Sequence, residues 1–341
     1  MMWKGTPVLV TGGASFIGSH LVDELCARGA NVSVIDNMSS GREENLSKSP
    51  MVRIYRSDLE YISLPELRKI FRGQKVVFHL AATHGGRGYI DTHPADVCSN
   101  FSIDHHVFEA CRLEDVERVV YASSACVYPP SLQARADSNY LLKEQDADLS
   151  DLSKPLSSDI EYGWAKLMGE VQLRAFIRQY GVRGASMRFV TAYGERENET
   201  HAIVALIYKA YQRMNPYIIW GDGEQSRDFT YVSDIVSGTI LAAEKIVDGR
   251  AINLGTGKRY RLKDVAQMIF DILDFHPNVQ VDRTKPTGVV SRALDISQAQ
   301  EVLGWGPKVS LREGLERTAK WYVASHEATG IVNDRALMER T

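Results

Sequence analysis

The sequence lacks the features of several large protein classes. It has only four cysteines, and Cys26, Cys98, Cys111 and Cys126 form no CxxC pair and no metal-ligand spacing. This favours reduced thiols over a disulfide framework or a zinc site, and we expect no metal. No apolar run approaches the roughly 18 residues of a membrane span, and the first residues lack the apolar core of a signal peptide. We therefore expect a cytoplasmic protein with no membrane partner.

The charge is balanced and moderate. Forty basic and 43 acidic side chains give a formal charge of −3, without a long block of one sign. A nucleic-acid partner is not expected from such a distribution. With 44% apolar and 24% charged residues, the chain has the material for a large buried core, and disorder is excluded as its main state.

The first half alternates short apolar runs with amphipathic stretches. Such alternation predicts strand and helix units that build a parallel, doubly wound α/β sheet of the Rossmann type. The expected strands are 8–10, 32–35, 52–55, 76–80 and 118–121, and the expected helices are 16–28, closed by Gly29, and 95–112.

The second half predicts a smaller, interleaved α+β lobe after a polar loop over 129–159. A dinucleotide-binding domain over 1–190, with 228–255 returning to it, would leave 191–227 and 256–326 for the substrate-binding lobe and 327–341 as a loose tail. The expected elements are a long helix over 160–180, strands over 183–189 and 251–254, and helices over 233–247, 262–273 and 311–325.

A glycine-rich turn links the first strand to the first helix. Gly12 permits the tight turn and Gly18 lets the helix pack closely, although Ser15 stands where such fingerprints usually have a glycine. Backbone amides at this helix start can hold a pyrophosphate, and Asp36 at the end of the next strand can accept both ribose hydroxyls. NAD is therefore favoured as the cofactor, although the nearby Arg42 leaves NADP as an alternative. A further alternative is that the glycines only form a turn and bind no cofactor.

Tyr162 and Lys166 stand four residues apart, on one face of the long helix. A tyrosine with the ordinary pKa of about 10 is a poor base at neutral pH, so its activation needs a nearby lysine and a bound nicotinamide cation. Ser124, at the end of a strand, can offer a hydroxyl beside the phenol. The spacing alone is equally compatible with a surface Tyr/Lys pair.

These motifs resemble the extended short-chain dehydrogenases/reductases of the nucleotide-sugar epimerase and dehydratase group. The segments 220–223, 227–234, 253–255 and 303–305 agree with that group. The resemblance implies a homodimer formed through the helices over 95–112 and 160–180. It also implies that Arg227 and Arg292 bind the substrate diphosphate, although either arginine could instead form a surface ion pair. It also implies NAD contacts by Gly12, Ser15, Phe16, Ile17, Gly18, Asp36, Asn37, Asp58, Leu59, Ala81, Tyr162 and Lys166.

The segments 79–90 and 121–129 resemble the GDP-mannose 3,5-epimerases more specifically. The resemblance makes Cys126 an acid–base group facing the sugar carbons, where dehydratases and decarboxylases carry acids, and places Gly85, Gly86 and Gly88 against the hexose. A thiolate at this position needs a cation or a histidine nearby. Cys126 is alternatively a small hydrophobic residue, and His84 and Arg87 either contact substrate or face solvent.

The second acid–base group of those epimerases is a lysine after the strand that ends near 189, and this chain has none before Lys209. His201 is the best-placed titratable group, with an ordinary pKa near 6.5 that suits proton transfer. It is alternatively a loop histidine without chemistry. Thr191 stands where many relatives have an asparagine that touches the substrate, which leaves the sugar open.

The sequence thus predicts an NAD-dependent nucleotide-sugar epimerase that oxidises C4, inverts C3 and C5 through a 4-keto sugar, and reduces C4 again. One alternative is a UDP- or dTDP-sugar 4-epimerase or related enzyme, with Cys126 as a spectator. Another is a non-catalytic NAD-binding sensor.

Overall fold

The computed structural model describes residues 3–46, 52–136, 139–149 and 157–329. Its main sheet has seven parallel strands in the order β11-β6-β5-β4-β1-β2-β3. The sheet grows from β1 in both directions, which confirms the doubly wound Rossmann-type fold. Its strands are β1 (Pro7–Thr11), β2 (Asn31–Asp36), β3 (Val52–Arg56), β4 (Val76–His79), β5 (Arg118–Ser124), β6 (Gly184–Phe189) and β11 (Asp248–Leu254).

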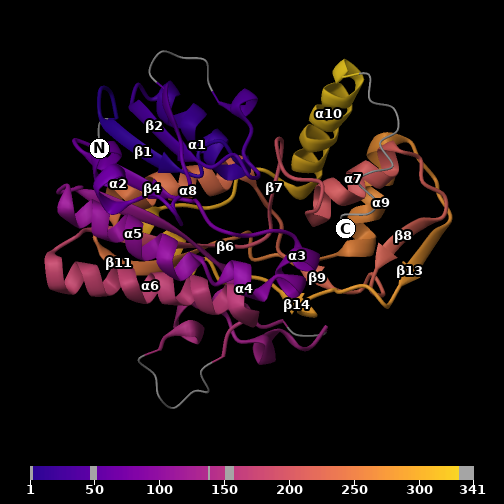
Figure 1. Ribbon diagram of the computed structural model, residues 1–341. Helices are drawn as coiled ribbons and strands as arrows, with labels where there is room; N and C mark the ends of the chain where they lie inside the picture. Colours follow the sequence, from indigo (N-terminus) through magenta and orange to yellow (C-terminus); the bar gives the residue numbers. More distant parts are fainter. Residues whose placement is uncertain (1–2, 47–51, 137–138, 150–156, 330–341) are drawn as a thin grey trace.

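Alternate strand residues feed two hydrophobic cores on opposite faces of this sheet. Val8 and Val10 belong to the core under α1 and α8, whereas Leu9 between them belongs to the core under α2, α5 and α6. Figure 1 shows these two helical layers on either side of the sheet. The helices are α1 (Phe16–Ala27), α8 (Val232–Lys245), α2 (Leu64–Phe71), α5 (Asn100–Leu113) and α6 (Ile160–Tyr180).

Shorter elements gather at one end of the sheet (Figure 1). They comprise α7 (Ala202–Tyr211), α9 (Leu262–Leu273), α10 (Leu311–Thr329) and three small sheets. The small sheets pair β8 (Tyr217–Trp220) with β13 (Val279–Asp282), β7 (Ala192–Tyr193) with β10 (Thr230–Tyr231), and β9 (Ser226–Arg227) with both β12 (Tyr260–Arg261) and β14 (Ser291–Arg292).

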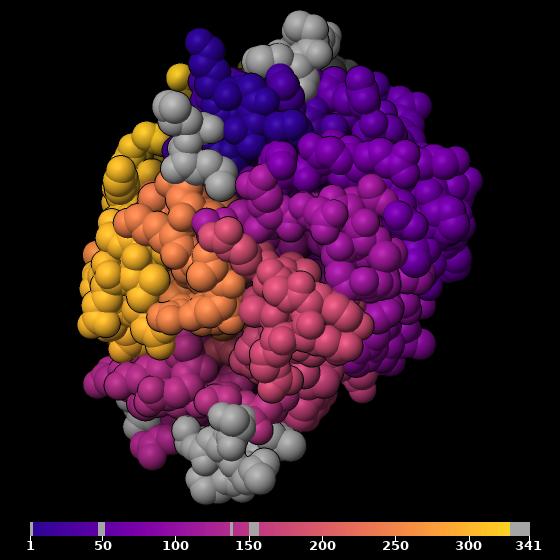
Figure 2. All heavy atoms as spheres, turned by 90° about the vertical axis from the view of Figure 1, so that its left-hand side faces the viewer, coloured from indigo at the N-terminus to yellow at the C-terminus, as the bar shows by residue number. Residues whose placement is uncertain are grey.

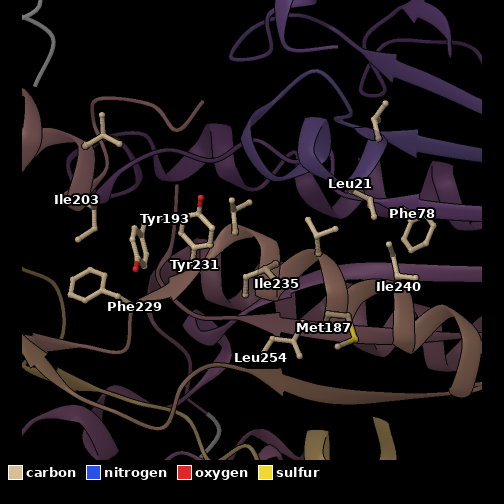
Figure 3. Packing of buried hydrophobic residues seen from close by; sticks show 14 of the residues in the cluster. Leu21, Phe78, Met187, Tyr193, Ile203, Phe229, Tyr231, Ile235, Ile240 and Leu254 are labelled. Atoms are coloured by element: carbon tan, nitrogen blue, oxygen red, sulfur yellow. The ribbon is translucent and has the colours of Figure 1, made fainter. Parts of the chain in front are cut away.

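One apolar core joins this end to the main sheet. Figure 3 shows it running from Leu21 and Phe78, past Ile235, to Tyr231 and Ile203 at the start of α7. Figure 2 shows the opposite end of the molecule, where the pink residues of α6 lie beside the orange residues of the α8–β11 region. The apolar core of Figure 3 holds the smaller sheets against the edge where the parallel strands end.

The predicted helix over 95–112 is wrong in one respect: it is two helices, α4 (Pro94–Val97) and α5, preceded by the short α3 (Arg87–Thr92). Asn100 explains the break, because its Nδ2 donates to the carbonyl oxygens of Val97 (2.8 Å) and Thr83 (2.9 Å). Such side-chain bonds compete with helical hydrogen bonding.

The structure also differs from the predicted polar loop and the predicted C-terminal tail. The loop over 129–159 contains short helical turns at Pro130–Gln133 (η3) and Glu144–Ala147 (η4). The tail predicted from 327 is wrong for its first three residues, since α10 continues to Thr329, and 330–341 lie outside the described residues. No helix in the described part of the chain has the length and apolar character to cross a membrane.

Candidate active site

The glycine-rich turn has the tight geometry of a dinucleotide cradle. Gly12 has φ +68°, and a Cβ there would lie 2.8 Å from the backbone nitrogen of Ala81. A Cβ on Gly18 would lie 2.1 Å from the carbonyl oxygen of Gly12. Both positions therefore exclude any larger residue. The first amides of α1, at Phe16, Ile17 and Gly18, lack intrahelical acceptors and are available to a pyrophosphate.

Asp36 closes this cradle at the end of β2. Its carboxylate is 6% exposed and accepts hydrogen bonds from the amides of Ala14 (2.9 Å) and Met38 (2.8 Å). These bonds fix the carboxylate beside the turn, where it suits a ribose diol better than a phosphate. The guanidinium of Arg42 is exposed and lies 3.5 Å from Glu44. Among the described residues, this arrangement therefore fits NAD and places no buried cation beside Asp36 for a 2′-phosphate.

Residues expected at the adenosine side lie next to this carboxylate. Asn37 Nδ2 donates to Asp58 Oδ2 (2.8 Å), and the other oxygen of Asp58 accepts from the amide of Glu60 (2.8 Å). Leu59 differs from this pair, because its side chain is buried in the core under α2 and α5. Only the backbone of Leu59 is therefore left to contact a cofactor. Ser15 Oγ lies 3.3 Å from Ser40 Oγ.

The turn after β5 brings Ser124 and Cys126 to the start of α6. Ser124 Oγ accepts from the amide of Cys126 (3.1 Å), which begins the short turn η2 (Ala125–Val127). The carbonyl oxygen of Cys126 accepts from the amide of Asp159 (2.9 Å), one residue before α6. A Cβ on Gly163 would lie 2.1 Å from that same oxygen. Glycine there lets the helix carrying Tyr162 press against the turn.

Lys166 is 2% exposed, and its Nζ lies 4.8 Å from the centre of the Tyr121 ring. Burial lowers the pKa of Lys166, and the charge of Asp104 acts in the opposite direction. Burial raises the pKa of Tyr162, and the charge of Cys126 raises it further. The surroundings of Tyr162 therefore disfavour the phenolate, and a bound nicotinamide would add a positive charge that opposes this shift.

A buried polar chain beneath Lys166 has no counterpart in the sequence predictions. His79 Nδ1 lies 2.8 Å from Thr11 Oγ1, and His79 Nε2 lies 3.0 Å from Asp104 Oδ1. Tyr121 Oη donates to Asp104 Oδ2 (2.6 Å), and all four residues are fully buried. The chain links the cofactor turn to the lysine. Its parts lie too far apart in sequence for any spacing pattern to reveal it.

Cys126 lies beside a guanidinium. Arg292 Nη1 donates to Cys126 Sγ (3.4 Å), while its Nη2 donates to Asp159 Oδ2 (2.8 Å) and its Nε to Gln133 Oε1 (2.5 Å). Burial acts to lower the pKa of Arg292, but the charges of Cys126 and Asp159 outweigh it and raise the pKa. Arg292 can thus supply the positive charge that a thiolate at Cys126 would need. Because Arg292 is buried, it is not the surface ion-pair partner considered as an alternative.

Two more arginines meet near the same carboxylate. Arg87 Nη1 donates to the other oxygen of Asp159 (2.9 Å) and leaves Nε to Asp91 (2.9 Å). Arg227 donates to the carbonyl oxygens of Ser226 (2.8 Å) and Thr287 (2.6 Å). Burial, with the charges of Arg292 and Arg87, lowers the pKa of Arg227 to about 9. The cluster has more positive than negative charge and is suited to bind an anion.

The loop of Gly85, Gly86 and Gly88 runs from this cluster to two histidines. A Cβ on Gly86 would lie 2.4 Å from the carbonyl oxygen of Thr200, so the loop packs directly on the residue before His201. The rings of His84 and His201 have their centres 6.1 Å apart. His201 caps the start of α7, and its Nδ1 lies 3.2 Å from Glu197 Oε1. Glu197 is a site residue that spacing did not single out.

Within the described ranges, no group of three or more His, Cys, Asp or Glu side chains is arranged to hold a metal ion. The site therefore consists of a dinucleotide cradle, a Ser/Tyr/Lys set, a thiol beside an arginine, an anion-binding cluster and a histidine pair. Together with the fold, this set defines the class of dinucleotide-dependent enzymes that use a tyrosine and a lysine on one helix.

Comparison with known proteins gives the family. Residues 8–255 match the model of the NAD dependent epimerase/dehydratase family, and the chain belongs to this family. It is an NAD-dependent enzyme of the epimerase type, as the sequence predicts. A putative UDP-glucose 4-epimerase of Methanocaldococcus jannaschii is 32% identical over 92% of this chain and 97% of its own length. A GDP-mannose 3,5-epimerase of Oryza sativa subsp. japonica is 29% identical over 92% and 81%.

A solved structure agrees. The UDP-glucose 4-epimerase of Thermus thermophilus, in complex with NAD, has a TM-score of 0.80 and 26% identity, and the match covers 94% of this chain and all of that one. The 3,5-epimerase resemblance is therefore one of several of similar strength, and the 4-epimerase relative has the slightly higher identity.

Proposed function

We propose that this protein is a nucleotide-sugar 3,5-epimerase that oxidises its hexose transiently at C4, with GDP-mannose as the first substrate to test. The observation that carries the proposal is the contact between Cys126 Sγ and Arg292 Nη1 at 3.4 Å, in the turn that also carries Ser124. A thiol kept only for packing needs no guanidinium partner. A thiol that removes a proton from carbon does.

The first step belongs to α6 and β5. Tyr162 takes the proton of the C4 hydroxyl, Lys166 stabilises the phenolate, and Ser124 holds the hydroxyl in place. When bound, NAD supplies the hydride acceptor for C4 and returns the hydride at the end of the cycle. Because burial raises the pKa of Tyr162, proton removal is confined to the state in which the positive cofactor is present.

The ketone at C4 acidifies the hydrogens on C3 and C5. Cys126 as thiolate takes one of these protons and becomes a thiol, and the electron pair of the C–H bond moves into an enolate on O4. His201 as imidazolium then gives a proton to the same carbon on the other face and becomes neutral. Both groups regain their starting states by proton exchange with water.

Substrate binding rests on the arginine cluster and the glycine loop. Arg227, half-buried and without a carboxylate hydrogen-bond partner among the described residues, suits a diphosphate oxygen. Arg87 and Arg292 add charge on either side of Asp159. Gly85, Gly86 and Gly88 allow the hexose to approach the backbone closely. These features support a nucleoside diphosphate hexose and leave the base undecided.

The test is incubation in D₂O with GDP-mannose, UDP-glucose, UDP-glucuronic acid and dTDP-glucose, followed by NMR and mass spectrometry of the sugar. We expect deuterium at C3 or C5 with the wild type. In Cys126→Ser it falls by at least about 100-fold, the scale of a lost acid–base group. Cys98→Ser is the matched control and keeps the wild-type rate. No deuterium from any of the four sugars contradicts the proposal.

A UDP-sugar 4-epimerase is the second candidate, favoured by the relatives described above. It inverts C4 without deuterium at C3 or C5, and Cys126→Ser leaves its rate intact. An NAD-binding sensor turns over none of the sugars, and Tyr162→Phe changes nothing in it. In either enzyme Tyr162→Phe removes activity, while Tyr61→Phe, at a tyrosine 79% exposed, does not.

A further inference from the structure

The loop before α7 holds a carboxylate whose burial needs an explanation. Glu197 is 5% exposed, its Oε1 lies 3.2 Å from His201 Nδ1, and its Oε2 is buried with no hydrogen-bond partner among the described residues. Burial raises the pKa of Glu197, and the bond to His201 and the nearby backbone amide of Gly194 act against that shift. A carboxyl group so poorly compensated has a structural cost. Such residues are often retained for chemistry.

The contact with Glu197 sets the tautomer of His201. A carboxylate only accepts, so Nδ1 carries the hydrogen and donates it, and Nε2 is left to exchange protons. His201 is held firmly: its carbonyl oxygen accepts the amide of Ala205 (2.8 Å), and its side chain is 27% exposed. Its backbone at φ −92° and ψ 150° is the extended conformation of a helix cap. The ring is thereby fixed opposite the loop that carries His84.

His84 faces His201 from the glycine loop and is the more exposed of the two. The protein atoms packed around its ring lower its pKa, and the charges of His201 and Lys166 act in the same direction. His84 is therefore neutral at neutral pH. A neutral imidazole accepts a proton on one nitrogen and donates from the other, so His84 can pass a proton between water and a neighbouring ring.

We propose that Glu197, His201 and His84 form a proton relay between the sugar and solvent, which rests on the function proposed above. Glu197 is the positioning residue. His201 Nε2 gives its proton to the sugar carbon, and the neutral His201 then takes a proton that reaches it from water through His84. The proton taken by Cys126 leaves to water, so each inversion exchanges one proton and consumes no other reactant.

Deuterium incorporation tests the relay in the full chain with its cofactor. Relative to the wild type in D₂O, His201→Gln lowers incorporation by at least about 100-fold and Glu197→Gln by at least about 10-fold, because the amide favours the wrong tautomer. Glu197→Asp restores part of the rate. His84→Gln slows the reaction, and added imidazole buffer rescues this variant but not Glu197→Gln. Glu199→Gln in the same loop, whose carboxylate binds Tyr322, is the control and stays at the wild-type rate.

A second readout does not depend on turnover. Long-range ¹H–¹⁵N NMR of the histidine rings reports the tautomer of His201, and we expect hydrogen on Nδ1 in the wild type and a shift toward Nε2 in Glu197→Gln. Wild-type incorporation that survives in His201→Gln, or an unchanged tautomer in Glu197→Gln, overturns the relay and leaves the epimerase proposal standing. If the wild type incorporates no deuterium, both proposals fail.

Discussion

At the scale of single residues, Asp159 provides the negative charge that compensates the arginines of the anion-binding cluster. It is buried, and each carboxylate oxygen accepts from a different arginine, Arg87 or Arg292. Burial acts to raise the pKa of Asp159, but the two arginines outweigh it and lower the pKa. We expect Asp159→Asn to lower the free energy of unfolding by about 3 kcal/mol, because the buried guanidinium of Arg292 loses its counter-charge and the half-buried guanidinium of Arg87 loses one of its two carboxylate partners.

The pH dependence of this loss follows from the direction of the shift. A carboxylate with a lowered folded-state pKa stabilises above its unfolded pKa of about 3.9, and loses that contribution as the pH falls toward its folded value. Urea unfolding of wild type and variant should therefore differ equally at pH 8 and pH 5, and less below about pH 4. Asp91→Asn, at the exposed end of Arg87, is the control and costs less than about 1 kcal/mol. Equal losses at the two sites contradict this account.

At this scale, the sequence reveals residues that sit in one local pattern. The glycines of the cofactor turn, Asp36, and the Tyr162/Lys166 pair follow from spacing on a strand, a turn and a helix. Asp159, Glu197 and Asp104 do not, because they matter through their partners. Asp159 meets arginines 72 residues before it and 133 after it. Such contacts depend on the folded chain, and no periodicity encodes them.

At the scale of elements, α6 ties β5 and β6 together through a buried ion pair. Glu170 is 0% exposed and accepts from Arg188 Nε (2.9 Å) and Nη2 (2.8 Å), and from Ser123 Oγ (2.5 Å). Arg188 in turn reaches Tyr128 Oη (3.1 Å). Both strands end at the active-site edge, so this network holds Ser124 and Cys126 in register with the helix that carries Tyr162.

Glu170→Gln should destabilise the protein by about 3 to 5 kcal/mol, since it leaves the guanidinium of Arg188 buried without a counter-charge. For a domain of this size, that lowers Tm by roughly 10 °C. Differential scanning calorimetry measures the change. Glu316→Gln, whose carboxylate meets Arg312 on the exposed side of α10, should shift Tm by less than about 2 °C. A small shift for Glu170→Gln would show that the pair contributes little.

The long elements were predictable because each satisfies a local rule. The parallel strands and helices such as α6 and α9 are periodic in sequence, and they lie within a few residues of their predicted limits. The two-residue strands β7, β9, β10, β12 and β14 carry no such signal, since only their partners define them. The break between α4 and α5 depends on Asn100 reaching Thr83, which is again a contact outside the local pattern.

At the scale of the whole molecule, the active site lies where distant segments meet. Cys126 follows β5, Arg292 belongs to β14, and Arg87 opens α3. Return of the chain to the main sheet at β11, next to β6, places β12 and β14 at the strand ends. The sequence indicated two interleaved lobes, but the pairing of β14 with β9, which aligns Arg292 with Arg227, comes only from the folded chain.

The same scale carries the prediction of a homodimer through α5 and α6. These helices share a surface hollow of about 350 Å³ lined by His105, Glu109, Ala175, Phe176, Gln179 and Tyr180. Phe101 on α5 and Tyr180 on α6 are 37% and 48% exposed. Aromatic side chains at such exposure are enriched at protein interfaces, and self-complementary burial of two equal faces is the common arrangement.

Sedimentation velocity of the full chain should therefore give a dimer. Tyr180→Asp should shift it to monomer, because it removes the aromatic ring over which Arg112 lies at 4.7 Å and places a charged group in the interface. Val281→Asp, at a residue 48% exposed on β13, a strand outside the main sheet, should stay dimeric. The monomer should keep its fold. It should lose part of its activity, because the interface helix α6 also supports the turn that carries Cys126. A wild type that sediments as a monomer contradicts the prediction, as does a Tyr180→Asp variant that stays dimeric.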